Sequence, residues 1–303
     1  MTFDVIIIGG GPAGLAAAIY AGRAKLGGII LEKMSPGGQV LITDFVENYP
    51  GFVEGISGFE LVEKFTEHAK RFGITVENGE VSSIEPVGAE FNLNLTDGRT
   101  ITSKTVIITT GATHRKLGVK GEQELTGRGV SYCATCDGPF FKDQVVAVVG
   151  GGDSAVQEAI FLTKFAKKVY LIHRRDQLRA IKILQERAFS NDKIEFIWNS
   201  TVEEIKGKDQ VEAIKIVNKL TGETSCLNVD GVFIFIGIEP TTHFVKGLVD
   251  MDQRGFIKTD EWMRTSVKGI YAAGDCRKKP LLQIVTAVAE GATAAFAVEH
   301  DLA

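Results

Sequence analysis

The chain has 303 residues, of which 44% are hydrophobic and 24% charged, as is usual for soluble globular proteins, and it is long enough for two domains. Its 34 basic and 38 acidic residues give a net charge of −4, which argues against a general nucleic-acid binder or a protein of anionic membranes. The first residues run directly into an apolar segment, without a basic region or a long apolar stretch. We therefore predict a cytoplasmic protein without a secretory signal or a membrane span.

The first predicted unit is a strand, a glycine-rich turn, a helix and a second strand. The strand covers residues 3–8, the Ala-rich helix runs from residue 12 to about residue 24, and the second strand, residues 28–31, ends at Glu32. The turn has the sequence Gly9-Gly10-Gly11-Pro12-Ala13-Gly14. This order is typical of the βαβ unit that binds a dinucleotide, with the phosphates at the N-terminus of the helix.

A helix, a hairpin, a strand and a pair of cysteines follow in the middle of the chain. Residues 58–72 are amphipathic and predict a helix, and residues 91–100 alternate around an Asp-Gly turn and predict a hairpin. A buried strand is predicted over residues 105–109. The cysteine pair lies in the sequence Cys133-Ala134-Thr135-Cys136-Asp137-Gly138.

The second half of the chain repeats the first unit. A strand over residues 145–149, a glycine turn, a helix over residues 154–165 and a strand over residues 169–172 follow in the same order. The turn has the sequence Gly150-Gly151-Gly152-Asp153-Ser154-Ala155. The register is also kept, because Glu32 follows Gly9 by 23 positions and His173 follows Gly150 by 23 positions. We therefore predict an α/β protein with two Rossmann-like nucleotide-binding domains of the three-layer ββα type.

The residue at the end of the second strand distinguishes the two nucleotide sites. Glu32 offers a carboxylate to ribose hydroxyls, and its charge repels a 2′-phosphate, so the first site suits FAD or NAD(H). The second site has His173, Arg174 and Arg175 instead, followed by Arg179. Guanidinium groups form short, charge-assisted hydrogen bonds with phosphate, so this site favours NADPH. The alternative is that the basic stretch is only a solvated turn.

The last part of the chain is predicted to return to the first domain. A strand over residues 230–237 completes the second unit, and a strand over residues 270–275 and a helix over residues 283–298 follow. We predict a discontinuous FAD-binding domain of residues 1–115 and 243–303 and an NADPH-binding domain of residues 116–242 that carries the cysteine pair. The linkers are expected near residues 113–118 and 238–243.

The cysteine pair predicts redox chemistry, because cysteines two residues apart can close a small, reducible disulfide. A zinc site, the alternative, needs further ligands, and only the isolated Cys226 and Cys276 and scattered histidines remain. Asp137 offers a carboxylate for proton exchange with a departing thiolate, although Asp-Gly is also a common turn pair. A dithiol between two nucleotide sites predicts an electron relay.

The chain resembles the low-molecular-weight, bacterial-type thioredoxin reductases, which are FAD-dependent pyridine nucleotide-disulfide oxidoreductases. The resemblance spans the whole chain in motif order. It is carried by both glycine turns, the cysteine motif, Glu47-Asn48-Tyr49-Pro50-Gly51, Thr110-Gly111-Ala112, the basic residues between 173 and 179, and Ala273-Gly274-Asp275. It implies a homodimer with one FAD per subunit, in which NADPH reduces FAD, FAD reduces the Cys133–Cys136 disulfide, and the dithiol reduces thioredoxin. By position, Cys136 faces the flavin, Cys133 attacks the thioredoxin disulfide and Asp137 is the acid and base.

The resemblance also implies the nucleotide contacts, and it implies no metal. For FAD they are Gly9, Gly11, Pro12, Ala13, Gly14, Glu32, Gly38, Gln39, Asn48, Val81, Gly111, Asp275, Gln283 and Ile284. For NADPH they are Gly150, Gly152, Asp153, Ser154, Ala155, His173, Arg174, Arg175, Arg179, Ile236 and Gly237. The chain departs from the family pattern at Leu282, where many relatives have arginine.

Two other interpretations use the same motifs. A flavin disulfide reductase or dithiol oxidase of the same fold would take electrons from ferredoxin or pass them to oxygen. Such relatives tend to lack an intact nicotinamide-phosphate site, and this chain keeps Arg174, Arg175 and Arg179. A non-catalytic redox sensor is less favoured, because both cysteines, Asp137 and both nucleotide motifs are intact.

Overall fold

A computed structural model of the chain describes residues 2–41, 43, 46 and 48–303, apart from the side chains of Thr135 and Cys136. The chain divides into two compact units. Unit 1 comprises residues 1–113 and 239–303, and unit 2 comprises residues 114–238. These divisions fall two and four residues before the domain boundaries predicted at 115/116 and 242/243. No helix in the described part of the chain combines the length and apolar composition that crossing a bilayer requires.

Unit 1 is built on a mixed sheet covered by helices. Its strands are β1 (Phe3–Ile8), β2 (Gly28–Glu32), β3 (Thr75–Asn78), β4 (Val81–Val87), β5 (Glu90–Leu95), β6 (Thr100–Ile108) and β17 (Ile270–Ala272). Its helices are α1 (Pro12–Arg23), α2 (Gly58–Arg71) and α6 (Ile284–Leu302), with short 3-10 turns η1 (Gly38–Val40) and η3 (His243–Val245). The strand order is β3-β2-β1-β6-β5-β4, and β17 pairs with β6. Strands β1, β2, β3, β6 and β17 run parallel, whereas β5 is antiparallel to β6 and β4 is antiparallel to β5.

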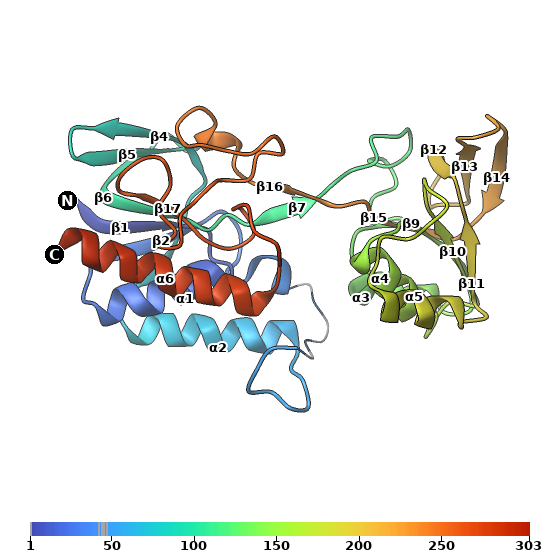
Figure 1. The fold of residues 1–303 in the computed structure, drawn as a ribbon, viewed down its shortest axis with the longest axis horizontal. Coiled ribbons are helices and arrows are strands. Elements are labelled where there is room, and N and C mark those ends of the chain that lie inside the picture. Colours follow the sequence, from blue (N-terminus) through green and yellow to red (C-terminus); the bar gives the residue numbers. More distant parts are fainter. Residues whose placement is uncertain (1, 42, 44–45, 47) are drawn as a thin grey trace. The chain divides into compact units, whose positions relative to one another are not determined.

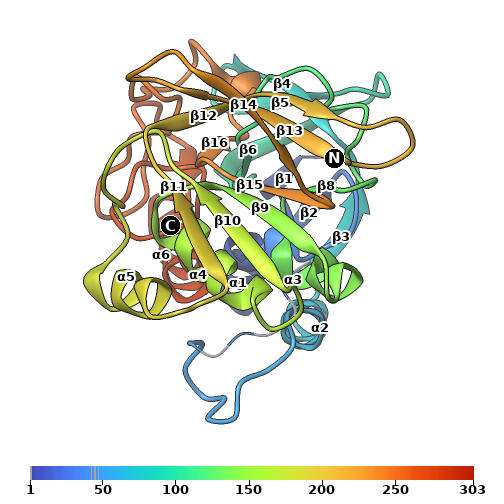
Figure 2. The ribbon, with the colours of Figure 1, turned by 90° about the vertical axis from the view of Figure 1, so that its right-hand side faces the viewer.

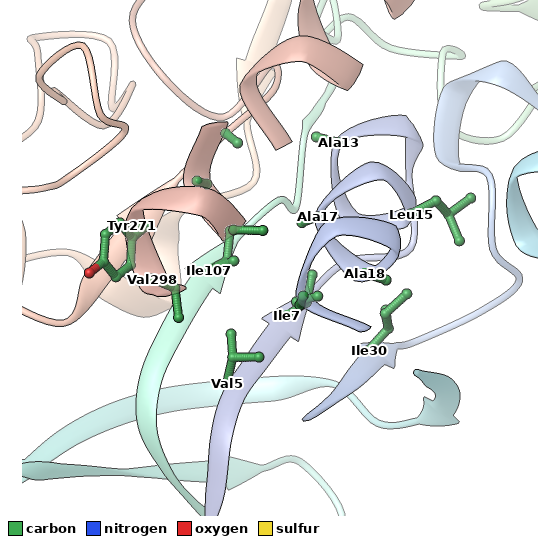
Figure 3. Packing of buried hydrophobic residues seen from close by; sticks show 14 of the residues in the cluster. Val5, Ile7, Ala13, Leu15, Ala17, Ala18, Ile30, Ile107, Tyr271 and Val298 are labelled. Carbon is green, nitrogen blue, oxygen red and sulfur yellow. The ribbon is translucent and has the colours of Figure 1, made fainter. Parts of the chain in front are cut away.

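The alternation of strand side chains creates the three layers of unit 1. Val5 and Ile7 of β1 pack with α1 and α6 on one face of the sheet (Figure 3). Ile6 and Ile8 point to the opposite face and pack against residues of β4 and β5. Because successive side chains of a strand point to opposite faces, the apolar run Val5–Ile8 of β1 serves two cores. Figure 1 shows α1, α2 and α6 along one side of this sheet.

Unit 2 repeats this arrangement on a smaller scale. Its parallel sheet has the order β11-β10-β9-β15-β8, and β12, β13 and β14 form a separate antiparallel sheet. The strands are β8 (Val130–Ser131), β9 (Val145–Gly150), β10 (Lys168–Ile172), β11 (Ile194–Ile197), β12 (Ser200–Lys206), β13 (Ala213–Asn218), β14 (Thr224–Asn228) and β15 (Gly231–Phe235). The helices are α3 (Ala134–Asp137), η2 (Gly138–Phe141), α4 (Asp153–Leu162) and α5 (Lys182–Phe189).

The faces of the parallel sheet in unit 2 again belong to two cores. Val146 and Val148 of β9 pack with α4 on one face, whereas Ala147 and Val149 pack with β12 and β13 on the other. Figure 2 shows the helices and the antiparallel sheet on opposite sides of β9 and β10. The predicted fold class, two Rossmann-like domains of the three-layer type, is therefore confirmed.

Several predicted bounds need correction. Helix α4 ends at Leu162 and not at residue 165, because the Lys193 ammonium donates hydrogen bonds to the Thr163 and Ala166 carbonyls and holds the chain in a turn. Helix α6 continues to Leu302 beyond the predicted end at 298, since Asp301 is fixed by Arg264 through two hydrogen bonds. The linkers carry strands, because β7 (Ala112–His114) and β16 (Ile238–Pro240) pair with each other.

Candidate active site

The glycines of the first turn have distinct structural tasks. Gly9 has a φ of 103°, and a Cβ there would lie 2.6 Å from the Thr109 carbonyl oxygen. A Cβ at Gly14 would collide with the Gly9 carbonyl oxygen, so helix and strand touch there through backbone. At Gly11, in contrast, a Cβ would meet nothing within 4 Å. The space beside Gly11 is therefore unfilled by other protein atoms, so a phosphate can approach the backbone of the turn there.

The helices after both glycine turns begin without a side-chain cap. Gly11 is the N-cap of α1 and Gly152 is the N-cap of α4, and neither helix has a capping side chain. By comparison, Ser57 caps α2 by accepting a hydrogen bond from the Glu60 amide at 3.1 Å. The first amides of α1 and α4 are thus not taken by a capping side chain, which suits anion binding.

Glu32 lies beside the first turn at the end of β2. Its Oε2 accepts a hydrogen bond from the Gly10 amide at 2.7 Å, and its Oε1 accepts one from the Met34 amide at 3.0 Å. These bonds fix the carboxylate next to the fingerprint backbone. Because Leu31 pairs with Ile8 in parallel β1 and β2, Glu32 and the glycine turn leave the sheet at the same edge.

Other residues predicted to bind FAD gather at this edge. Gly111 follows β6 and Asp275 follows β17, and these strands run parallel to β1. Gly38 approaches Gly11, since a Cβ at Gly38 would lie 3.6 Å from the Gly11 Cα. Gln39 is exposed beside Gly38 in η1.

Asn48 and Gln283 are also brought together, although they are far apart in the sequence. The Asn48 amide nitrogen donates to the Gln283 side-chain oxygen at 2.9 Å, immediately before Ile284 begins α6. Glu47, next to Asn48 in the motif, lies outside the described residues. Val81 is different from the others because its side chain is buried in the apolar layer, so only its backbone suits a nucleotide contact.

Asp275, whose side chain is 35% exposed, belongs to a group of otherwise more buried charges that the sequence motifs did not identify. Its carboxylate lies 3.1 Å from the Lys279 ammonium, which is also 3.3 Å from Glu290. Glu290 binds Arg277 at 2.8 Å and accepts a hydrogen bond from the Gly274 amide. Burial raises the pKa of Asp275, and the Lys279 charge opposes this shift. The pairing of Asp275 with Lys279 could have been predicted from their spacing of four residues, whereas the sequence gives no signal for the contact with Glu290.

This edge of unit 1 fits a flavin dinucleotide. It combines an uncapped helix N-terminus, an open backbone at Gly11, an acid at the end of β2 and a second acid after β17. These groups provide donors for phosphate and acceptors for hydroxyls.

The turn of unit 2 has the same construction. A Cβ at Gly150 would collide with the Phe235 backbone, whereas at Gly152 it would meet nothing within 4 Å. Ala155 is buried, and the Asp153 carboxylate accepts a hydrogen bond from the Ile181 amide at 2.7 Å. Ser154, in the first turn of α4, is exposed.

Ile236 and Gly237 leave the sheet at the same edge as this turn. They directly follow β15, which is parallel to β9 and places Phe235 opposite Gly150. Gly237 has a φ of 119°, and a Cβ there would meet nothing within 4 Å. The carboxyl edge of the sheet in unit 2 therefore holds the glycine turn and these two residues, as the prediction for NADPH requires.

The four basic residues between positions 173 and 179 comprise one buried imidazole ring and three exposed cations. His173 is only 4% exposed, and its ring lies against Gly151. Burial lowers its pKa, and the nearby Arg179 charge lowers it further, so the ring is neutral near pH 7. Arg174, Arg175 and Arg179 are exposed, and no ion pair within the described part of the chain involves them. Three unpaired guanidinium groups beside an uncapped helix fit a phosphate.

The first cysteine of the motif is part of a disulfide. Cys133 is disulfide-bonded, whereas Cys226 is an exposed thiol and Cys276 a buried one. Ser131 Oγ accepts a hydrogen bond from the Cys133 amide at 3.0 Å and donates one to the Cys133 carbonyl at 3.1 Å. The Cys136 side chain lies outside the described part of the chain, and Asp137 ends α3 without capping η2. Within the described residues, no cluster of three potential metal ligands occurs.

The fold and these sites define a class of protein. The model of the family described as pyridine nucleotide-disulphide oxidoreductase matches residues 3–291, and the chain belongs to this family.

Within the family, the similar proteins are thioredoxin reductases. The thioredoxin reductase of Listeria innocua is 51% identical over 96% of this chain and 91% of the relative, and that of Bacillus subtilis is 50% identical over 98% and 94%. The crystal structure of Lactococcus lactis thioredoxin reductase has 45% identity, a TM-score of 0.92 and 99% coverage of both chains. The predicted resemblance to this group is thus confirmed.

Proposed function

We propose that the chain is an NADPH-dependent thioredoxin-disulfide reductase. Its electrons pass from NADPH to FAD, then to a Cys133–Cys136 disulfide, and finally to the disulfide of oxidised thioredoxin. Unit 1 binds FAD and unit 2 binds NADPH. Glu32 and His173 carry this assignment, because they occupy the same place in two matching βαβ units and differ in chemistry. The similarity to thioredoxin reductases supports thioredoxin as the acceptor.

The residues of each unit suit a different task. When bound, FAD accepts the two electrons of NADPH as a hydride and releases them as a pair to a disulfide. Gly11 and the amides of α1 would hold the pyrophosphate of FAD, and Glu32 would accept hydrogen bonds from its ribose hydroxyls. Arg174, Arg175 and Arg179 bind the 2′-phosphate, while the neutral His173 fills the space against Gly151.

The cysteine pair completes the transfer. Two electrons and two protons convert the Cys133–Cys136 disulfide into two thiols, and Asp137 supplies and accepts a proton. The Cys133 thiolate then attacks the thioredoxin disulfide, forming a mixed disulfide and releasing one thioredoxin thiol. The Cys136 thiolate displaces the second thioredoxin thiol and restores the Cys133–Cys136 disulfide. The net reaction consumes NADPH and one proton and yields NADP⁺ and reduced thioredoxin.

We also expect a homodimer in the cytoplasm. Trp262 and Phe296 stack with their ring centroids 5.8 Å apart, and they are 38% and 52% exposed. An exposed aromatic pair on unit 1 is a suitable contact for a second copy. A predominantly monomeric state in sedimentation at micromolar concentration would contradict this expectation.

The proposal is tested by comparing NADPH, NADH and reduced ferredoxin as donors and one thioredoxin as acceptor. The purified protein should be yellow, and anaerobic NADPH should bleach it and generate two thiols. Cys133→Ser should retain flavin bleaching by NADPH and lose thioredoxin reduction, because only the second half of the relay needs this thiol. If reduced ferredoxin supports turnover and NADPH does not, the assignment of NADPH as the electron donor is refuted. If Cys133→Ser still reduces thioredoxin, the proposed role of Cys133 in the electron relay is refuted.

A further inference from the structure

A buried carboxylate lies beside the redox motif in unit 2. Glu122 is 3% exposed, although ionisable side chains are rarely so buried without partners. Its Oε1 accepts hydrogen bonds from the Leu117 amide at 2.9 Å and the Tyr132 hydroxyl at 2.7 Å, and its Oε2 accepts one from the Gly118 amide at 2.6 Å. One carboxylate thus gathers three donors from two separate segments.

The two segments have different places in the chain. Residues 114–118 are the first residues of unit 2, directly after the chain leaves unit 1 through β7. Tyr132 follows β8 and directly precedes Cys133. Glu122 therefore connects the entry of the chain into unit 2 with the residue beside the disulfide.

The Tyr132 ring is held from a second direction. His114 stacks against it with centroids 6.3 Å apart and planes 25° apart, and His114 also meets Phe235 edge-on. Burial and the hydrogen bond to Glu122 both raise the pKa of Tyr132, so the hydroxyl keeps its proton and remains a donor. The hydroxyl and the ring face are thus both in contact with unit 2 residues.

Cys133 is therefore restrained on both sides of its own backbone. Ser131, which is buried, bonds to the amide and the carbonyl of Cys133, and Tyr132, which lies between these two residues in the sequence, is held by its hydrogen bond to Glu122. Disulfide exchange needs the attacking sulfur aligned with the disulfide that it attacks, and small misplacements of a reacting group lower rates strongly. A backbone fixed in this way favours one orientation of the Cys133 sulfur.

We propose that Tyr132 and Glu122 are positioning residues for Cys133 in the transfer of electrons to the thioredoxin disulfide. The hydrogen bonds described for Glu122 and Tyr132 join the two side chains to each other and to the amides of residues 117 and 118, so we assign them a positioning role. Their effect passes through the hydrogen bond between the hydroxyl and the carboxylate, which fixes the segment that presents the thiol. The inference rests on the proposed function for its substrate, whereas the restraint on Cys133 does not depend on that function.

The test uses the full-length, FAD-loaded protein with Tyr132→Phe, which removes the hydroxyl and keeps the ring. The kcat for thioredoxin should fall about tenfold, the effect of one lost charge-assisted hydrogen bond on the barrier. The KM for NADPH and the rate of flavin bleaching by NADPH should stay within about twofold, because the NADPH motif of unit 2 is unchanged. Tyr20→Phe, at a half-exposed tyrosine of α1, is the matched control and should match wild type.

A second measurement separates the inference from the proposed function. Iodoacetamide should alkylate Cys133 of the chemically reduced Tyr132→Phe protein severalfold faster than in wild type, whichever acceptor the enzyme uses. Glu122→Gln should behave similarly, and the double variant should be no worse than Glu122→Gln alone. The inference would be overturned if Tyr132→Phe had the wild-type alkylation rate and the wild-type kcat for thioredoxin. It would also be overturned if the rates of flavin bleaching by NADPH and of thioredoxin reduction fell by the same factor. Failure of wild type to reduce thioredoxin would refute only the function.

Discussion

At the scale of single residues, the two proposed nucleotide sites differ in the residue that follows or ends the second strand of the βαβ unit, which is Glu32 in unit 1 and His173 in unit 2. Glu32 bonds to the Gly10 amide, and His173 lies against Gly151, so each side chain touches the middle glycine of its own turn. The acid carries charge to the site, whereas the pKa of His173 is lowered and the charge comes from exposed arginines. The same backbone arrangement therefore presents a negative charge to the ribose of the ligand in unit 1 and positive charges to the ribose of the ligand in unit 2.

This difference predicts the effect of removing two arginines. Arg174→Ala with Arg175→Ala should raise the KM for NADPH by about tenfold or more, because each charge-assisted hydrogen bond contributes about 1.5 to 3 kcal/mol. The KM for NADH, which lacks the 2′-phosphate, should change little. Steady-state kinetics with both donors measures the effect, and Arg187→Ala, at an exposed arginine of α5, is the control. Equal losses for the two donors would contradict a 2′-phosphate site.

A second residue makes the stability of unit 2 depend on pH. Burial raises the pKa of Glu158 in α4 to about 7, and its Oε2 has no hydrogen-bond partner among the described residues. Because the folded pKa exceeds the unfolded value, its contribution to stability is complete below about pH 4.5 and is lost as pH rises through 7. This loss amounts to about 3 kcal/mol at most.

Glu158→Gln should therefore raise the melting temperature relative to wild type at pH 8 and change it little at pH 4.5. Calorimetry at both values measures the difference. Glu186→Gln, at an exposed acid of α5, should show no such dependence. A melting temperature of Glu158→Gln below that of wild type at pH 8 would mean that the ionised carboxylate stabilises the fold.

At the scale of elements, close contact between helices shapes the first site. A Cβ at Gly291 of α6 would collide with the carbonyl of Ala13, in the first turn of α1. Gly274, before Asp275, also lies near Ala13, where its Cβ would be 2.9 Å from that of Ala13. The C-terminal helix thus determines where the N-terminus of α1 lies.

Gly291→Ala should consequently destabilise the protein by up to about 2 kcal/mol. Alanine favours a helix by about 1 kcal/mol, but overpacking costs about 1 to 3 kcal/mol and the helices cannot separate without moving Ala13. Urea unfolding gives the stability, and FAD retention after gel filtration should fall because the phosphate-binding turn is displaced. Thr293→Ala, at an exposed hydroxyl of α6, is the control. If Gly291→Ala had wild-type stability and retained its FAD fully, α6 could move away from Ala13 without cost and the expectation would be wrong.

At the scale of the whole molecule, the order of the chain explains why unit 1 is discontinuous. Strand β17 joins the parallel sheet next to β6, and the Ala273 amide donates to the Ile108 carbonyl at 2.9 Å. The segment after unit 2 therefore supplies a strand, Asp275 and α6 to the first site. Unit 2, in contrast, builds its sheet from one continuous segment.

The sequence by itself determined the repeated βαβ units, and it predicted the ligand of each nucleotide site and the redox chemistry of the cysteine pair. These features are local, because glycine turns, apolar strands and the residue at a strand end depend on spacing along the chain. The predicted helix over residues 58–72 and the hairpin over residues 91–100 were found for the same reason.

Only the tertiary structure decided which distant residues complete the sites. Gln283 reaches Asn48, Glu290 fixes Lys279 and Arg277 beside Asp275, and Glu122 holds Tyr132. Such partners carry no local signature, because a buried charge requires compensation by whichever donors or charges packing brings within hydrogen-bond distance. Periodicity and spacing describe neighbours along one strand or helix, whereas these contacts depend on how separate elements pack together.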